Sequence, residues 1–230
     1  MTLSDSVVVL GQAAFSGCEK MESLTMSRNI KTIEDYTFSN CKSLKSITLY
    51  RSIYSIGYKA FEQCVSLENI IIPDSVNIIE EYAFFGCEKV TSMTIPNSVI
   101  NIGGGVFAGC NNLTNVSVDS ENPRYVSVNN CIISGNELVA VCNNFIIPND
   151  MEITSIGKYA ISHVNESSIN IPKSITNIGF MAVTGCSNLR DIYYEMTTND
   201  WNLITKDQNW FMNNADCSIN CIDGMISTAS

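Results

Sequence analysis

The sequence is poor in charge. Only 16% of its 230 residues are Asp, Glu, Lys or Arg, while 45% are hydrophobic, a balance that excludes a disordered tail or a coiled coil because both need far more charge. Basic residues are the scarcer kind, since 13 Lys and Arg stand against 23 Asp and Glu and leave a net charge of −10. A surface of that sign repels phosphate backbones and anionic lipid. We therefore expect no nucleic-acid partner, and a packed body rich in strands.

Histidine is almost absent. The single copy, His163, excludes a metal site or proton relay that needs two histidines. No G-x-S-x-G elbow or comparable signature surrounds any Ser or Cys, and no D-x-[DN]-x-[DN]-G calcium loop occurs. Gly103-Gly104-Gly105 lacks the Lys-Ser/Thr of a phosphate loop, so we interpret these glycines as a bend. The sequence predicts no catalytic residue, no metal ligand and no cofactor, and hence no enzyme.

Long apolar runs are missing too. None approaches the roughly 18 residues that span a bilayer, and residues 1–5 lack the basic and apolar regions of a signal peptide. We expect no membrane insertion. Because the first residues already fit the middle of the repeat described next, we also expect the natural protein to continue upstream and to carry its signal there.

What the chain does have is a strict period of 23 residues. Phe and Cys recur in two linked series, with each Cys three residues after a Phe, and such a period indicates stacked structural repeats. The fullest unit, residues 67–87, reads L-x-x-I-x-I-P-x-x-V-x-x-I-x-x-x-A-F-x-x-C. The two series are Phe15, Phe38, Phe61, Phe84 and Phe107, and Cys18, Cys41, Cys64, Cys87 and Cys110.

This pattern fits the leucine-rich-repeat consensus. Its Ile-Pro and Ala-Phe-x-x-Cys elements resemble the BspA-like, or Treponema-type, leucine-rich-repeat family of bacterial and protist surface proteins. The resemblance covers nearly the whole chain in seven units, although the sixth has Val164 at the Cys position and lacks one residue, while the seventh restores Cys186. It implies an α/β-type, mostly β, right-handed solenoid with a parallel sheet, short strands and turns on the opposite wall, and a C-terminal cap.

We predict one solenoid domain over residues 1–230, with repeats at 3–118 and 145–192. Each repeat contributes one strand whose alternate side chains face inward, as those of Leu67, Ile70 and Ile72 would. The stacked strands bury a core that no single repeat could close alone. A tight bend toward the opposite wall would be permitted by Gly57, Gly103, Gly157 and Gly179.

Two segments break the period. Residues 119–144 contain Gly135-Asn136 between two strand-like runs, which predicts a β-hairpin that we expect to extend the sheet rather than to project as a recognition element. Residues 193–226 contain both tryptophans and resemble the C-terminal caps of secreted gut-bacterial members of the family. We expect Trp201 and Trp210 to be buried over the open end of the solenoid rather than to stack on sugar rings.

Ten cysteines suggest zinc binding or disulfides, but no C-x-x-C pair occurs. Six occupy the repeat position and project in parallel from stacked turns, a geometry wrong for a disulfide, so we predict that they are small buried hydrophobic residues. In the hairpin we expect Cys131 to face Ala140 and not Cys142. The disulfide candidates of a secreted protein are therefore Cys131, Cys142, Cys217 and Cys221.

With no chemistry in the sequence, function must lie on a surface. The row of outward strand positions has a structural interpretation, because Thr suits exposed strands, and a functional one, as a flat polar groove for a protein or glycan ligand. We hypothesise a noncatalytic, monomeric binding module of a secreted or cell-surface bacterial protein; the alternative is a structural spacer that projects or connects another domain. The candidate partner-binding residues are Thr25, Thr48, Ile71, Thr94, Ser117 and Tyr193.

Overall fold

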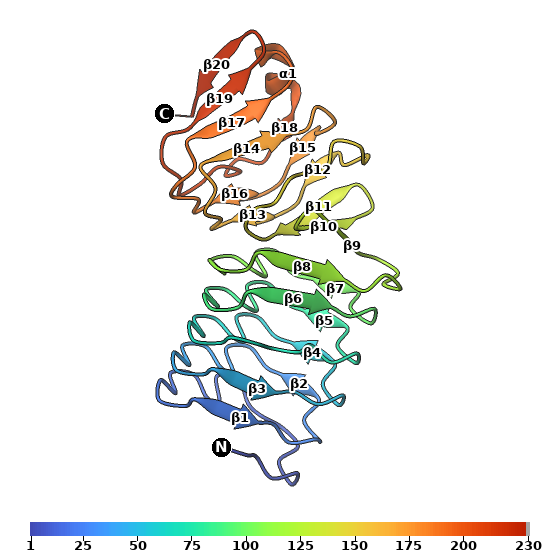
Figure 1. The fold of residues 1–230 in the computed structure, drawn as a ribbon, viewed down its shortest axis with the longest axis vertical. Helices are drawn as coiled ribbons and strands as arrows, with labels where there is room; N and C mark the ends of the chain where they lie inside the picture. The colour runs from blue at the N-terminus through green and yellow to red at the C-terminus, as the bar shows by residue number, and fades with distance from the viewer. Residues whose placement is uncertain (229–230) are drawn as a thin grey trace.

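The computed structural model describes residues 1–228 and forms a solenoid of about nine turns. Its turns are stacked along the long axis from the N-terminal end to the C-terminal end (Figure 1). Strands make up nearly all of its regular structure, and the helix among the described residues, α1 (Thr198–Leu203), is short. The predicted fold, a mostly β solenoid with parallel sheets, is confirmed. No helix of residues 1–228 is long and apolar enough to cross a membrane.

The first wall of the solenoid carries its candidate binding row. Its strands pair in parallel with the equivalent residues of the next turn, so that Leu24 lies beside Ile47 and Met93 beside Val116. Alternate residues along each strand are buried and exposed because successive side chains point to opposite faces. The strands are β1 (Ser23–Thr25), β3 (Ser46–Thr48), β6 (Ser92–Ile95), β8 (Asn115–Val118), β14 (Ser168–Ile171), β17 (Asp191–Tyr194), β19 (Ser218–Cys221) and the antiparallel β20 (Gly224–Ser227).

The second wall consists mainly of two-residue strands. Each of these pairs in parallel with a strand of the neighbouring turn, whereas β10 pairs antiparallel with β9 and β11. Its N-terminal sheet is β2 (Thr32–Ile33), β4 (Ser55–Ile56), β5 (Ile78–Ile79) and β7 (Asn101–Ile102). Its C-terminal sheet is β9 (Val126–Val128), β10 (Cys131–Ser134), β11 (Glu137–Val141), β12 (Ser155–Ile156), β15 (Asn177–Ile178) and β18 (Thr205–Lys206). The third wall is mostly turns and contains one strand pair, β13 (Ile161–Ser162) and β16 (Val183–Thr184).

Phenylalanine rings stack through the interior of the first five turns. Phe38, Phe61 and Phe84 are completely buried, and successive ring centroids lie 5.2 Å and 5.5 Å apart. The cysteines of the second to fifth turns tie neighbouring turns together, because each Sγ donates a hydrogen bond to the carbonyl oxygen of the Phe in the preceding turn, as Cys64 does to Phe38 at 3.2 Å. Burial of the predicted inward residues Leu67, Ile70 and Ile72 is also confirmed.

The glycines between the walls have a different role from the one expected. At Gly57, Gly103, Gly157 and Gly179 the backbone does not adopt the left-handed conformation that favours glycine. A Cβ atom at Gly103 would instead lie 2.2 Å from the backbone nitrogen of Glu81 in the preceding turn. Left-handed backbone freedom is therefore not the reason for glycine at these positions. At Gly57, Gly103 and Gly157 backbone atoms of the preceding turn would lie within 2.9 Å of a Cβ, whereas at Gly179 the nearest atom would lie at 3.1 Å.

The hairpin expected at Gly135-Asn136 is formed by β10 and β11, and it lies inside the stack rather than projecting from it (Figure 1). Ile132 and Ala140 belong to the hydrophobic core of the N-terminal turns, whereas Ile133 and Leu138 belong to that of the C-terminal turns. Since both faces of the hairpin are buried, it is a partition between two cores. β11 then pairs in parallel with β12, which restarts the regular repeat.

On the third wall the two halves of the solenoid meet directly across this interruption. The ring of Tyr82 lies 5.0 Å from that of Tyr159, and Glu81 forms a 2.7 Å ion pair with Lys158, 77 residues away in the chain. Gly105 permits this contact, because a Cβ there would lie 2.6 Å from the Tyr82 ring. The interpretation of Gly103-Gly104-Gly105 as a bend is thus incomplete, since the glycines also clear the space through which the two halves touch.

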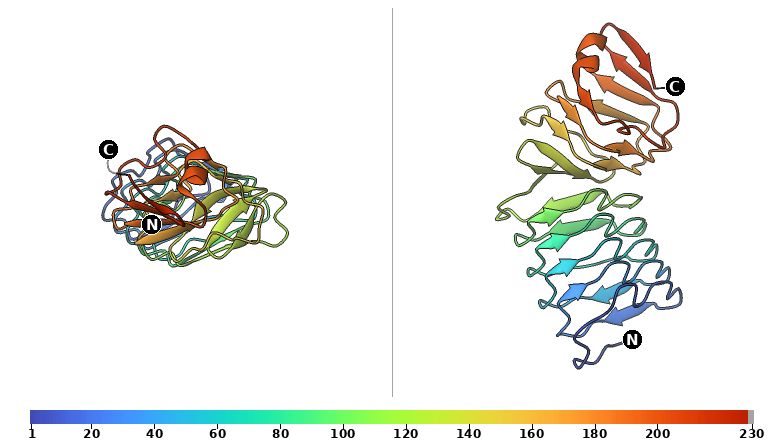
Figure 2. Two further views of the ribbon diagram at one scale, coloured as in Figure 1. Left: turned by 90° about the horizontal axis from the view of Figure 1, so that it is seen from above. Right: turned by 180° about the vertical axis from the view of Figure 1, so that it is seen from behind.

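The C-terminal end continues the stack before closing it. β18 pairs in parallel with β15 and β19 with β17, while β20 folds back antiparallel on β19, and α1 lies at this end of the molecule (Figure 2). A capping box starts α1, because the Thr197 side chain accepts from the Asp200 amide and Asp200 accepts from the Thr197 amide. Trp201 is 3% exposed as expected. Trp210 is partly exposed, so the prediction that both tryptophans are buried is wrong for Trp210.

Candidate functional site

The strands of the first wall bring the predicted outward residues into one row. Thr25 pairs with Thr48, and Thr94 pairs with Ser117, whose hydroxyl lies 3.1 Å from that of Thr94. Tyr193 occupies the same position in β17, where it pairs with residues of β14 and β19. The structure therefore places all six predicted residues on one face, with Tyr193 separated from the other five by the hairpin partition.

Apolar side chains stand out in this row. Ile71 is 83% exposed, the largest exposed fraction among the large hydrophobic residues of the described chain, and Tyr193 is 45% exposed. Their neighbours on the row carry hydroxyl or amide groups. Single exposed apolar residues are common on protein surfaces. Here, however, the repeat places them at the same outward position of different turns.

The predicted row lacked Asn170 and Asn220, which pair with Tyr193, and it also lacked Ile146. Ile146 is 63% exposed and directly precedes Ile147-Pro148, just as Ile71 precedes Ile72-Pro73. Alignment of these Ile-Pro pairs could have identified it. It was missed because the preceding insertion interrupts the period. Ile146 lies between Ser117 and Tyr193 in chain order, so the exposed apolar side chains extend past the partition.

A hollow of about 430 Å³ lies beside Ile71, where the sheet is interrupted. Asn69 forms an isolated bridge to Ser46, but no backbone hydrogen bond within residues 1–228 joins 69–72 to β6. The first wall is consequently split into separate sheets at this point. The hollow combines apolar side chains with hydroxyl, amide and carboxylate groups. Its lining residues are Asn69, Ile70, Ile71, Ile72, Asp74, Ser92, Thr94, Pro96 and Asp119.

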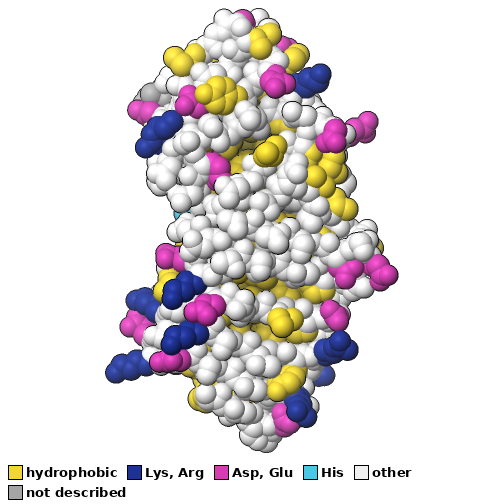
Figure 3. All heavy atoms as spheres, viewed as in Figure 1, with side chains coloured by type: hydrophobic (Ala, Val, Ile, Leu, Met, Phe, Trp, Pro, Cys, Tyr) yellow, Lys and Arg dark blue, Asp and Glu magenta, His cyan; other side chains and the backbone are white. Residues whose placement is uncertain are grey.

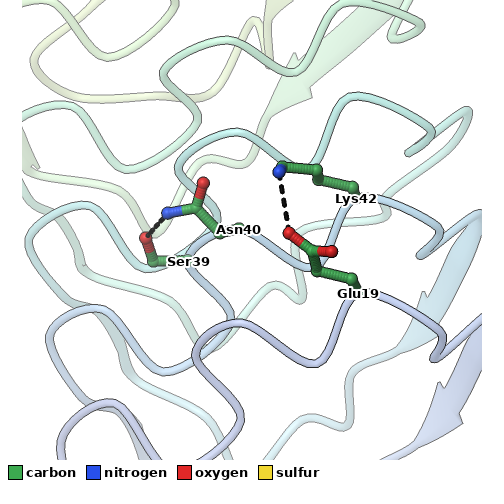
Figure 4. Close-up of polar contacts among 4 residues, drawn as sticks. All are labelled: Glu19, Ser39, Asn40 and Lys42. Atoms are coloured by element: carbon green, nitrogen blue, oxygen red, sulfur yellow. Dashed lines mark hydrogen bonds and ion pairs between the residues drawn. The ribbon is translucent and has the colours of Figure 1, made fainter.

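Charged residues flank the row instead of interrupting it. In Figure 3 the middle of this face is mostly uncharged, with hydrophobic atoms exposed along it, while Lys, Arg, Asp and Glu gather toward its margins. Several of these charges pair between neighbouring turns, as Lys42 does with Glu19 at 2.7 Å (Figure 4). That hydrogen bond and the charge of Lys42 lower the pKa of the Glu19 carboxyl. Similar pairs join Lys45 to Glu22 and Arg51 to Asp74.

The row offers contacts rather than reaction chemistry. Among residues 1–228 no group of three or more His, Cys, Asp or Glu side chains is placed to hold a metal ion. His163 lies on the third wall, where its ring packs edge-on against Phe85 at 5.1 Å and its Nδ1 has no hydrogen-bond partner among residues 1–228. Burial lowers the pKa of His163, which favours the neutral imidazole.

The cysteines are free thiols, including those outside the repeat positions. Burial of the repeat cysteines is confirmed except at Cys18, which is partly exposed in the first turn. Cys131 pairs with Val141 and not with Ala140, because a bulge between Ile132 and Ile133 shifts the register of the hairpin. The predicted pairing was therefore wrong by one residue. Burial raises the pKa of the Cys41 thiol to about 11 and that of Cys110 to about 12, which suppresses the reactive thiolate.

The repeat pattern matches a described protein family. The profile of the BspA type leucine rich repeat region, in six copies, covers residues 8–131 and 140–225. The chain belongs to the BspA-type leucine-rich-repeat family. The resemblance inferred from the Ile-Pro and Ala-Phe-x-x-Cys elements is confirmed. No curated protein matches the chain.

Solved structures share this fold at low sequence identity. A leucine-rich repeat protein from Bacteroides ovatus is 24% identical with a TM-score of 0.55, and the match covers 90% of this chain and 55% of that one. A leucine rich cell surface protein from Faecalibacterium prausnitzii is 21% identical with a TM-score of 0.53, covering 90% and 82%. The pneumococcal vaccine antigen PcpA is 17% identical with a TM-score of 0.63, covering 93% and 68%. The chain thus spans about half the length of the Bacteroides ovatus protein.

Proposed function

We propose that this chain is a noncatalytic binding module of a bacterial cell-surface or secreted protein, and that it engages a protein partner through the outward row of the first wall. The observation that carries the proposal is the exposure of Ile71 and Ile146 in a row whose other members carry hydroxyl or amide groups. Family membership supports it, as does the likeness to a protein described as a cell surface protein.

Exposed aliphatic and aromatic side chains supply binding energy when a partner removes them from water. Burying a side chain such as isoleucine contributes about 1.5–3 kcal/mol. Ile71 adjoins a hollow that can receive a partner side chain, and the surrounding hydroxyl and amide groups can hydrogen-bond to the partner. The carboxylates of Asp74 and Asp119 beside the hollow, together with the net charge of −10, favour a partner whose contact surface is apolar with a basic rim.

The test begins with a binding screen of the purified chain against immobilised extracellular matrix proteins and a glycan array. Any partner found is then measured against the triple variant Thr48→Arg, Ile71→Arg and Thr94→Arg. These three side chains are exposed, so the fold should remain intact. We expect the dissociation constant to rise by tenfold or more, because bulky cations would occupy the contact surface.

The matched control replaces three exposed neutral residues beside or on the second wall: Tyr54→Arg, Ile100→Arg and Asn101→Arg. It adds the same charge on another face and should leave binding within about twofold of the unmodified chain. Thermal melts establish that both variants are folded. Loss of binding by the control with retention by the row variant would place the recognition surface elsewhere.

The alternative function is a structural spacer, and the contact across the third wall favours it. The Tyr82–Tyr159 ring pair and the Glu81–Lys158 ion pair connect the two halves of the solenoid and would stiffen it as a rod. A spacer needs no ligand on the first wall. If the row variant retains every interaction of the unmodified chain, and removal of the solenoid from the natural protein shortens its reach, the spacer function is the correct one.

A further inference from the structure

A second concave site lies at the C-terminal end of the solenoid, away from the proposed partner-binding row. The segment from α1 to Met212 and the strands β19 and β20 enclose a hollow of about 410 Å³. Small-ligand sites commonly have volumes of about 300–1,000 Å³ and combine aromatic walls with a few polar groups. This hollow has both kinds of lining.

Three aromatic rings form its apolar part. Trp201 is buried and packs edge-on against Tyr194, with ring centroids 5.4 Å apart, so the base of the site is held in place. Trp210 lies 5.9 Å from Trp201, and its ring is tilted by 43° to that of Phe211 at 5.0 Å. Trp210 and Phe211 are only partly buried, which leaves aromatic surface available to a ligand.

The polar part consists of side-chain amides. Asn202, Gln208 and Asn209 line the hollow, and their side-chain amides form no hydrogen bond within residues 1–228. Each amide provides two donors and an acceptor. Together they can hydrogen-bond several hydroxyl groups of one ligand.

The cation at this site is directed inward. Lys206 also lines the hollow, but its Nζ donates hydrogen bonds to the carbonyl oxygens of Trp201 and Ile204 and lies 4.8 Å from the centroid of the Trp201 ring. Its charge is therefore engaged by the protein. With no other Lys or Arg among the described lining residues, the site is poorly suited to a phosphate or carboxylate ligand.

We infer that this hollow binds a neutral oligosaccharide. The apolar C–H face of a pyranose ring would pack on Trp210 and Phe211 and bury hydrocarbon surface, while its hydroxyl groups would hydrogen-bond the free amides of Asn202, Gln208 and Asn209. A purely apolar ligand would leave those amides unused. This site is independent of the proposed protein contact on the first wall.

The chain provides a direct probe of the site, because both of its tryptophans line the hollow. Titration with cellotriose, mannotriose or chitotriose should give a saturable change in tryptophan fluorescence for at least one sugar. Saturation-transfer NMR detects the same binding if the emission does not change. The double variant Gln208→Ala and Asn209→Ala should weaken that binding by about thirtyfold, which corresponds to two lost hydrogen bonds of about 1 kcal/mol each.

The matched control is Asn177→Ala with Asn199→Ala, two exposed amides outside the hollow. It should bind as the unmodified chain does. Absence of binding for all three sugars by both methods would overturn the inference. So would equal weakening by the control, or tighter binding of a uronic-acid trimer than of its neutral counterpart.

Discussion

Three glycine-to-alanine substitutions separate the two physical reasons why this solenoid uses glycine. At Gly103 the φ angle is not in the left-handed region, but there is no room for a side chain. A Cβ would lie 2.2 Å from the backbone nitrogen of Glu81 and 2.5 Å from the carbonyl carbon of Glu80. At Gly135 space is open but φ is +58°. At Gly11 neither constraint applies, since no atom lies within 4 Å and φ is not left-handed.

The expected costs follow from these environments. The atoms that obstruct Gly103→Ala belong to the backbone of the adjacent turn and cannot rotate away, so the turns must separate at a cost of about 3 kcal/mol or more. Gly135→Ala should cost about 1–2 kcal/mol, the penalty of a left-handed alanine. Gly11→Ala should be neutral or stabilise by up to about 1 kcal/mol, because alanine restricts the unfolded chain.

Urea unfolding followed by circular dichroism measures all three. With a slope of about 3 kcal/mol per molar urea, Gly103→Ala should lower the midpoint by about 1 M or more, and Gly135→Ala by about 0.3–0.7 M. Gly11→Ala is the control for the chemical change itself. If Gly103→Ala unfolds at the same urea concentration as Gly11→Ala, the close approach of the turns at Glu80 and Glu81 is not a constraint on the fold.

Further predictions concern the buried thiols and the single histidine. Cys41, Cys64 and Cys87 should resist iodoacetamide in the native protein and react after denaturation, as mass spectrometry of the labelled peptides would show; detection of disulfides among them would contradict the packing described here. Cys64→Arg should prevent folding or destabilise the protein by more than about 4 kcal/mol, measured by urea unfolding, because it places an unpaired charge in the core; Cys64→Ala is the control for loss of the thiol alone. Burial raises the pKa of Cys41 to about 11 and that of Cys110 to about 12, from 9.0. The stability that these thiols contribute is therefore complete below pH 9 and should be lost as the pH rises toward 12. Urea midpoints measured across that pH range test this. Burial lowers the pKa of His163 below 6.5, so the stability that the neutral imidazole contributes is present above that pH and lost on acidification. The imidazole NMR signals of this single histidine should titrate below pH 6.5. Titration at or above that value would contradict the burial of His163 against Phe85.

The repeat period predicted the contacts between neighbouring turns. Cys64 contacts the turn that contains Phe38, and Thr25 lies beside Thr48, because a constant offset places equivalent residues one above the other. The alternation of inward and outward residues likewise placed Ile70 in the core and Ile71 on the surface. The same reasoning missed Ile146, since the insertion before it removed the offset on which the alignment depended.

The solenoid, its inward and outward faces and the burial of every repeat cysteine except Cys18 could thus be predicted from the sequence, because each turn interacts chiefly with its neighbours at a fixed spacing. Features without a fixed spacing depend instead on how distant segments pack. The hairpin became a partition because both of its faces found a core, and Tyr82 met Tyr159 because Gly105 left room between them. The hollow at the C-terminal end likewise depends on how Trp210 packs against Trp201 and Phe211, which is a matter of side-chain volume and local chain path rather than of repeat position.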